Sequence, residues 1–290
     1  MTEYSGLPTE QPHPDRPELD AMAPEAIARL LLREEQRALH AVDAALPEIA
    51  TVCAWAADAL RAGGRLIYAG AGTSGRLGVL DASEMGPTFG AEPGRVVALL
   101  AGAPEAMTEA IEGAEDDYDA GARAVTELEP TERDVVIGIS MSGTAAFVIG
   151  ALDTAVGNRA LVTANPDADC EFKIVLGFGA EALAGSTRLK GGSATKTVLN
   201  MISTAAMAGS GAVYGPWMVR VRPTNRKLRD RAERMVATLA EVDHARAAEL
   251  LRGAGDDVRV AVLMAKLDLD ADTARQRLDA HGGRLREALA

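Results

Sequence analysis

The chain has 290 residues and a formal net charge of −12, which argues against nucleic acid and anionic membrane surfaces as partners. Its length allows a large core, in one large domain or in two unequal ones. The cysteines, Cys53 and Cys170, lie outside any CxxC pattern, and no histidine has a metal-ligand spacing, so we predict neither a disulfide framework nor a metal site. The N-terminus lacks an apolar signal core and no run of about 18 apolar residues occurs, so we expect a cytoplasmic protein.

The first 20 residues are rich in proline and acidic residues, which is typical of a mobile arm or of a strap lying on another surface. Pro24 is well placed to begin a helix, and apolar residues recur at helical spacing over 25–45. Pro47 opens a second predicted helix, which ends before Gly63 and Gly64.

Short apolar strands then alternate with helices. Strands are predicted at 65–69, 95–100, 134–140, 159–163 and 173–176, and helices at 76–85, 104–112, 115–127 and 144–156. This alternation predicts an α/β fold with a parallel sheet covered by helices on both faces. In such sheets ligands bind at the carboxyl ends of the strands, near a topological switch point.

A glycine-rich turn, Gly70-Ala71-Gly72-Thr73-Ser74-Gly75, follows the first strand and precedes a helix. Its backbone N–H groups and the helix dipole favour an anion. The turn lacks the Lys-Ser/Thr pair of a P-loop, and its hydroxyls crowd the place where a dinucleotide pyrophosphate must approach. On this turn alone, a sugar phosphate and a nucleotide are equally good ligands.

A second hydroxyl-rich turn, Ser140-Met141-Ser142-Gly143-Thr144, follows the strand at 134–140. One such turn is often only a helix N-cap. Two in one sheet favour a shared site for a phosphate or a sugar.

A long helix rich in small residues is predicted over 185–204. It contains three basic residues, Arg188, Lys190 and Lys196, which are able to face either an anion or the solvent.

Beyond residue 225 the composition shifts, and the sequence of residues 226–290 predicts a bundle of three to four helices.

Several long blocks, in order, resemble the N-acetylmuramic acid 6-phosphate etherase family over residues 9 to the end. They are AGAGTSGRLGVLDASEMGPTFG (69–90), IEGAEDD (111–117), DVVIGISMSG (134–143), GSTRLKGGSATKTVLNMIST (185–204) and LDAHGG (278–283).

The resemblance implies a sugar isomerase (SIS) domain, which is a Rossmann-like three-layer fold with a five-stranded parallel sheet flanked by helices. It also implies a homodimer and a small C-terminal helical domain similar to a ubiquitin-associated (UBA) fold. The expected organisation is an arm at 1–20, the SIS domain with its N-terminal helices at 21–225 (core 58–221) and the helical bundle at 226–290.

The implied reaction cleaves the lactyl ether of N-acetylmuramic acid 6-phosphate by elimination and hydration, in cell-wall sugar recycling. It yields N-acetylglucosamine 6-phosphate and D-lactate and uses neither a metal nor an organic cofactor. The proton at C2 is acidified by the neighbouring open-chain aldehyde, and the lactate oxygen needs a general acid to leave. Two carboxyl groups with different pKa values can do this work.

The family's catalytic glutamates fall on Glu84, as proton donor, and Glu115, as base, and the two roles are open to exchange. From the residues alone each would be a solvated surface carboxylate. The resemblance assigns the phosphate and sugar contacts to a larger set: Gly72, Thr73, Ser74, Ser140, Ser142, Gly143, Thr144, Ser186, Arg188 and Lys190. His281 is a further candidate, with its role left open.

The chain departs from the family pattern in the second turn, where Thr144 stands in place of an arginine. The loss of a guanidinium near the phosphate would weaken binding or change the preferred substrate. This change keeps open a non-catalytic sugar phosphate sensor like the glucokinase regulatory protein. A sugar phosphate isomerase of the same fold is a second alternative, and the blocks around Glu84 and Glu115 argue against it. Both glutamates and the first turn are kept, which favours an active etherase.

Overall fold

A computed structural model describes residues 4–290, so the first three residues of the predicted arm lie outside the described residues. The chain forms two compact units. The first consists of the residues up to Ala82 together with Gly94–Ser203, and the second of Ser83–Pro93 together with Thr204–Ala290. The second unit therefore includes the last turns of two long helices, at 83–89 and 204–209, in addition to the C-terminal bundle. The sequence predicts a single boundary between the two domains, at residue 226.

The first unit contains a five-stranded parallel sheet in the order β2-β1-β3-β4-β5. The strands are β1 (Leu66–Gly70), β2 (Val96–Leu100), β3 (Val135–Ile139), β4 (Asn158–Thr163) and β5 (Lys173–Val175). All five lie within one residue of their predicted bounds. Every residue of β1 and β3 is buried, as expected for central strands covered on both faces.

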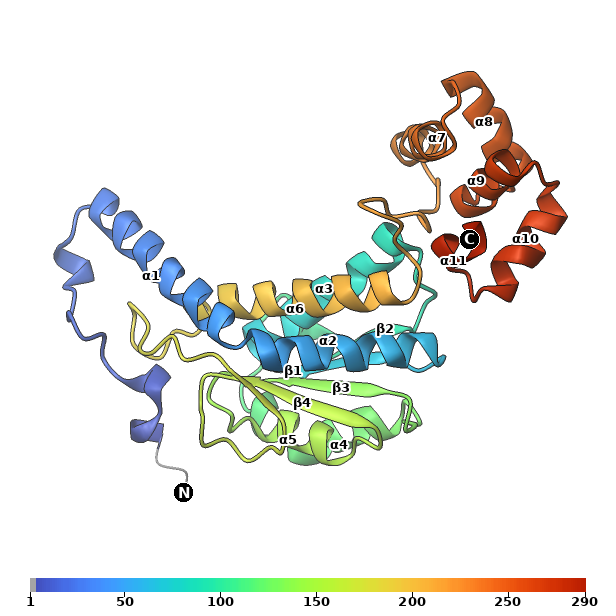
Figure 1. Cartoon of the computed structure of the whole chain (residues 1–290). Coiled ribbons are helices and arrows are strands. Elements are labelled where there is room, and N and C mark those ends of the chain that lie inside the picture. Colours follow the sequence, from blue (N-terminus) through green and yellow to red (C-terminus); the bar gives the residue numbers. More distant parts are fainter. Residues whose placement is uncertain (1–3) are drawn as a thin grey trace. The chain divides into compact units, whose positions relative to one another are not determined.

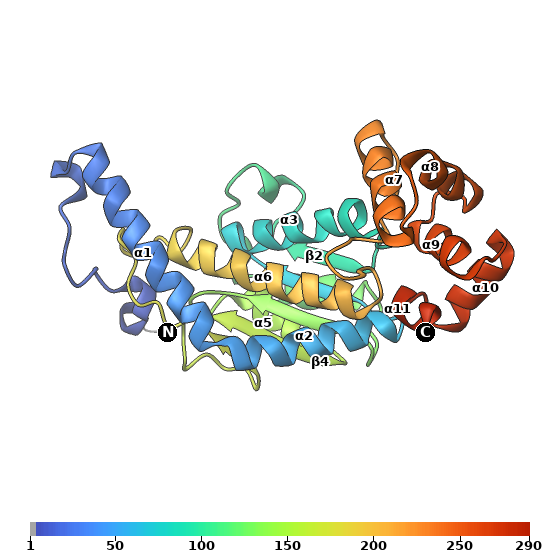
Figure 2. The ribbon, with the colours of Figure 1, turned by 45° about the horizontal axis from the view of Figure 1, so that its top comes forward.

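Among the described residues, six α-helices lie wholly or mainly in the first unit. They are α1 (Pro24–Ala44), α2 (Leu46–Arg61), α3 (Gly72–Phe89), α4 (Tyr118–Thr126), α5 (Ala146–Asp153) and α6 (Lys190–Gly209). Figure 1 shows α2 and α6 on one face and α4 and α5 on the other. Figure 2 shows α6 lying between α2 and α3. The predicted parallel sheet with helices on both faces is therefore confirmed.

Three predicted helices differ clearly from the structure. The helix predicted over 185–204 begins five residues later, at Lys190, and continues to Gly209, so Ser186 and Arg188 lie in the loop before it. The helix predicted at 76–85 begins four residues earlier, at Gly72, so that the glycine turn itself forms its first turn. The helix predicted at 104–112 is wrong, because only a short 3-10 turn, η4 (Glu105–Met107), forms there. A second short turn, η5 (Ala114–Asp116), precedes α4.

The N-terminal segment has three 3-10 turns, η1 (Tyr4–Gly6), η2 (Pro8–Glu10) and η3 (Leu19–Ala21). Leu7, Thr9 and His13 are buried. These contacts favour the strap over the mobile arm for the described part of this segment.

The second unit is built on the C-terminal helices α7 (Arg226–Ala240), α8 (His244–Gly253), α9 (Val258–Leu267), α10 (Ala271–Ala280) and α11 (Leu285–Leu289). Asn225, Asp243, Asp257 and Asp270 each cap the helix that follows with a side-chain oxygen. Buried residues from all five helices share one core with Val219 and Val221. The bundle therefore has one helix more than the largest predicted number.

Helices α4 and α5 approach each other closely enough to require glycine at two positions. A Cβ on Gly121 would lie 1.9 Å from the Phe147 carbonyl oxygen, and one on Gly150 would lie 2.1 Å from the Tyr118 carbonyl oxygen. We expect Gly121→Ala to lower the free energy of unfolding by at least about 2 kcal/mol, because the two helices must separate. Urea titration followed by circular dichroism measures this loss.

The matched control is Gly192→Ala in α6, where an added Cβ meets its nearest neighbour at an ordinary 3.7 Å. This variant should keep the stability of the parent or gain less than about 1 kcal/mol. Equal effects of the two substitutions would contradict the close helix contact.

Candidate functional site

The two hydroxyl-rich turns lie at the switch point of the sheet. The chain leaves β1 toward β2 on one side, and β3 returns to pair with β1 on the other side. Gly70 pairs with Ile139, so both turns begin at the same level. This is the place at which open α/β sheets bind ligands.

The first turn has its shape because of three glycines. A Cβ on Gly70 would lie 2.6 Å from the Gly75 nitrogen, and a Cβ on Gly75 would lie 2.5 Å from the Gly70 carbonyl oxygen. Gly72 has a φ of +52°. The strand can therefore pass directly into α3, and an anion is favoured at the N-terminus of this 18-residue helix by its N–H groups and dipole.

The second turn is a small network of hydroxyl groups. The Ser142 Oγ accepts hydrogen bonds from the Thr144 hydroxyl at 2.9 Å and from the Thr144 N–H at 3.3 Å. The Ser140 Oγ accepts from the Gly143 N–H at 3.1 Å. Asn165, which sequence reasoning missed, donates its Nδ2 to the Ser142 carbonyl at 2.9 Å and holds the turn from β4.

A cavity of about 370 Å³ joins the two turns, within the usual size range of small-ligand pockets. Of the residues predicted for the site, it is lined by Gly72, Thr73, Ser74, Glu115, Ser140, Ser142 and Thr144. The structure adds Tyr4, Thr9, Glu10, Asp116 and Thr187. Thr187 and Asp116 stand within blocks that carry the family resemblance, and Thr9 and Glu10 lie where that resemblance begins, so the resemblance was the available signal for these four residues.

Other predicted site residues are absent from the cavity lining. Gly143 has a φ of +71°, and a Cβ there would lie 2.5 Å from the Ala168 Cβ, so its role is to shape the turn. Ser186 is half-buried, Arg188 is exposed and His281 is half-buried at the end of α10.

Glu84 is exposed on α3, ten residues beyond Ser74. At the helical rise this spacing is about 15 Å along the axis. Glu84 is not among the residues that line the cavity.

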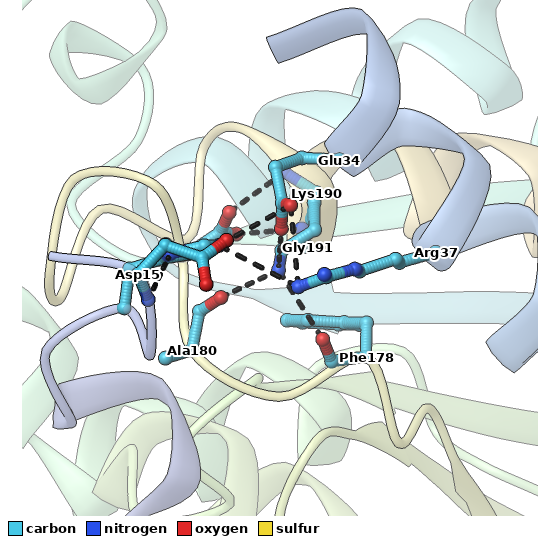
Figure 3. Close-up of polar contacts among 9 residues, drawn as sticks. Asp15, Glu34, Arg37, Phe178, Ala180, Lys190 and Gly191 are labelled. Atoms are coloured by element: carbon cyan, nitrogen blue, oxygen red, sulfur yellow. Dashed lines mark hydrogen bonds and ion pairs between the residues drawn. The ribbon is translucent and has the colours of Figure 1, made fainter. Parts of the chain in front are cut away.

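Lys190 has a different environment from the predicted one. It is 1% exposed, and its ammonium donates to the Glu34 carboxylate at 2.7 Å, to the Phe178 carbonyl at 3.2 Å and to the Ala180 carbonyl. Figure 3 shows these groups converging on the Lys190 nitrogen. All three N–H groups of the ammonium have protein acceptors, so it is not free to bind a substrate.

The other side of Glu34 completes this buried network. Its Oε1 lies 3.2 Å from the His13 Nε2 and 3.3 Å from the Arg37 guanidinium. Burial alone would raise the pKa of Glu34, but hydrogen bonds from Lys190 and His13 and the charges of Lys190 and Arg37 lower it. Glu34 is therefore a buried carboxylate with positive partners on two sides.

The remaining basic residues near the turns also bind protein groups. Arg76 donates to the Ala106 carbonyl at 2.8 Å and to the Glu109 carbonyl at 2.7 Å, which ties the 105–109 turn to α3. Lys196 lies 3.7 Å from the buried carboxylate of Asp81. Among residues 4–290, no arginine or lysine lines the cavity, so any phosphate there is bound by backbone N–H and hydroxyl groups.

The described residues contain no cluster of His, Cys, Asp and Glu suited to a metal ion. Across the same part of the chain, no helix combines the length and the apolar character that a membrane span needs.

A second, larger cavity of about 550 Å³ lies away from the two turns. Residues of α1, α2 and β5 line it, including Arg37, His40 and Lys173, and no residue of either turn does.

The chain is similar to known proteins over its whole length. Residues 48–156 match the family model of the glucokinase regulatory protein N-terminal SIS domain. The N-acetylmuramic acid 6-phosphate etherase of Gloeobacter violaceus is 46% identical over 100% of this chain and 97% of its own. Those of Deinococcus radiodurans and Salmonella agona are each 46% identical, over 97% and 98% of this chain and 94% and 98% of their own.

The buried network gives a first test. Lys190→Met should lower the free energy of unfolding by about 3–5 kcal/mol, because it leaves the Glu34 charge buried without its main partner. Adding Glu34→Met to this variant should restore part of the loss, because the uncompensated charge is then removed as well. Urea unfolding of the single and double variants measures both effects, and a double variant no more stable than the single one would contradict the pairing.

The same pair predicts a pH dependence. Because the pKa of Glu34 is lowered in the folded protein, its contribution to stability is complete above the ordinary value of 4.5 and is lost as the pH falls below it. The parent should therefore lose more stability on acidification below that value than Glu34→Gln does.

Proposed function

Because the chain belongs to the N-acetylmuramic acid 6-phosphate etherase family, we propose that it cleaves the lactyl ether of N-acetylmuramic acid 6-phosphate. The products are N-acetylglucosamine 6-phosphate and D-lactate, and the reaction is a lyase reaction of elimination followed by hydration. The observation that carries the proposal is the cavity at the switch point, which is lined by both hydroxyl-rich turns and by Glu115.

The phosphate is bound by the start of α3 and by the hydroxyls of Thr73, Ser74, Ser140, Ser142 and Thr144. Neutral donors of this kind suit a phosphate monoester in an acidic protein. The sugar chain then extends across the cavity toward Glu115. In this pose a carboxylate can remove the C2 proton, and a second carboxyl group must protonate the lactate oxygen as it leaves.

Glu84 is the family's candidate for that acid, yet it lies about 15 Å along α3 from Ser74, farther than the distance from the phosphate to C3 of the sugar. We propose that the protein acts as a homodimer and that each cavity receives Glu84 from the second copy. Exposed leucines support self-association: Leu32 and Leu39, seven residues apart on α1, are 68% and 56% exposed, and Leu46 at the start of α2 is 42% exposed.

We also propose that the protein is cytoplasmic and that its C-terminal helices have a fold similar to a UBA domain. A soluble sugar phosphate substrate is consistent with the first. Short capped helices around one core are consistent with the second.

The roles of the two glutamates can be separated in D₂O. The parent should release lactate, and Glu115→Gln and Glu84→Gln should each lower that rate by about 10²–10⁴-fold. If Glu115 is the base, Glu84→Gln should still exchange the C2 proton of the substrate for deuterium, whereas Glu115→Gln should not. Proton NMR follows both events in one sample.

The control is Glu127→Gln, which changes an exposed carboxylate just beyond α4. It should release lactate within about twofold of the parent rate, as surface changes usually do. Deuterium exchange by Glu115→Gln and none by Glu84→Gln would exchange the two roles. A parent that binds the sugar phosphate but releases no lactate would instead favour a sensor.

The shared site has a separate test. Glu84→Gln and Glu115→Gln are mixed, unfolded and refolded together. If each cavity combines Glu115 of one copy with Glu84 of the other, mixed dimers have one intact cavity, and the mixture should recover about one quarter of the parent activity. An inactive mixture containing mixed dimers would place both glutamates of a working site in the same chain.

A further inference from the structure

The hydroxyl of Thr9 is buried without a partner. Thr9 is 1% exposed, and its Oγ1 has no hydrogen-bond partner among the described residues. Buried hydroxyls in folded proteins are nearly always paired, and an unpaired one destabilises the fold. A valine of the same shape would fill this position without the free-energy penalty of an unpaired hydroxyl.

Thr9 lines the cavity that contains the two turns and Glu115. The neighbouring residue, Glu10, lines it too and is exposed. The Gly185 N–H donates to the Thr9 carbonyl at 3.0 Å. Gly185 has a φ of +76°, a conformation that favours glycine, and the Glu10 carboxylate lies 2.9 Å from where a Cβ on Gly185 would stand.

The strap is fixed a few residues further on by the buried network. His13 is 3% exposed, and its Nδ1 accepts from the Asp15 N–H at 3.2 Å, so its Nε2 carries the proton and donates to Glu34. Glu34 in turn binds Lys190 at the start of α6. Thr9 and Glu10 are therefore fixed at the cavity by the Gly185 hydrogen bond and by the His13 anchor.

We propose that Thr9 and Glu10 bind the amino-sugar part of the substrate, with the Thr9 hydroxyl and the Glu10 carboxylate hydrogen-bonding its hydroxyl and amide groups. A carboxylate repels a phosphate and accepts from O–H and N–H donors, so this pair recognises the sugar while the two turns bind the phosphate. Rotation about χ1 is the motion that would turn the buried Thr9 hydroxyl toward a ligand in the cavity that Thr9 lines. The inference rests on the proposed function for the identity of the sugar.

The test is Thr9→Val, which removes the hydroxyl and keeps the shape. Its KM for N-acetylmuramic acid 6-phosphate should rise about tenfold, the usual effect of one lost hydrogen bond to a ligand. Its Tm should stay equal to that of the parent or rise, because an unpaired buried hydroxyl is gone. Glu10→Gln should also raise KM, whereas Glu18→Gln, an exposed carboxylate of the same segment, should not.

Thr195→Val is the control for stability. The Thr195 hydroxyl is buried and donates to the Gly191 carbonyl at 2.7 Å, so its removal should lower Tm and leave KM unchanged. If Thr9→Val behaves in the same way, Thr9 is a packing residue and the inference is overturned.

Calorimetry separates this inference from the proposed function. The probes are N-acetylglucosamine 6-phosphate and inorganic phosphate. Thr9→Val should bind the sugar phosphate about tenfold more weakly than the parent and bind phosphate equally well. A parent that releases no lactate would overturn the etherase alone, whereas equal binding of the sugar phosphate by parent and variant would overturn the role of Thr9 alone.

Discussion

The ion pair between Lys190 and Glu34 joins parts of the first unit that are far apart in the sequence. Lys190 begins α6, Glu34 lies in the middle of α1, and the carbonyl groups of Phe178 and Ala180 belong to the loop between β5 and α6. Glu181 completes the arrangement by accepting from the N–H groups of Lys190 and Gly191 at 3.1 and 2.9 Å. Buried charges are tolerated only when every partner is present, so the network specifies one arrangement of these segments.

This network also explains how a proline-rich N-terminus becomes part of a site. Residues 4–20 contain only short 3-10 turns, which have little stability of their own. His13 gives them a fixed point on Glu34, and Gly185 gives them a second one at Thr9. Two attachments four residues apart are enough to hold Thr9 and Glu10 at the edge of the cavity.

The sequence predicts the sheet and the two turns well because both depend on local signals. Apolar runs of about five residues indicate buried strands, and glycine with serine or threonine after them indicates the turns. The role of Lys190 has no such signal, because its partner Glu34 lies 156 residues away and burial is a property of the folded chain. The unpaired hydroxyl of Thr9 is likewise visible only when its surroundings are known. The short turn at 105–109 replaces the predicted helix where Arg76 binds two of its carbonyl groups.

Ser74, in the first hydroxyl-rich turn, and Glu84 lie ten residues apart on the same helix, α3. Asp81 is 2% exposed and accepts from the hydroxyls of Tyr68 at 2.9 Å and Ser203 at 3.2 Å, which attaches the helix to β1 and to α6. Burial raises the pKa of Asp81, while Tyr68, Lys196 and Ser203 act in the opposite direction. With the helix attached at Asp81, the spacing between the phosphate turn and Glu84 is fixed by the helical rise and is too long for one amino sugar. The proposed reaction uses both glutamates on one substrate, and this spacing is the reason that the proposal takes the carboxylate on α3 from a second copy of the chain.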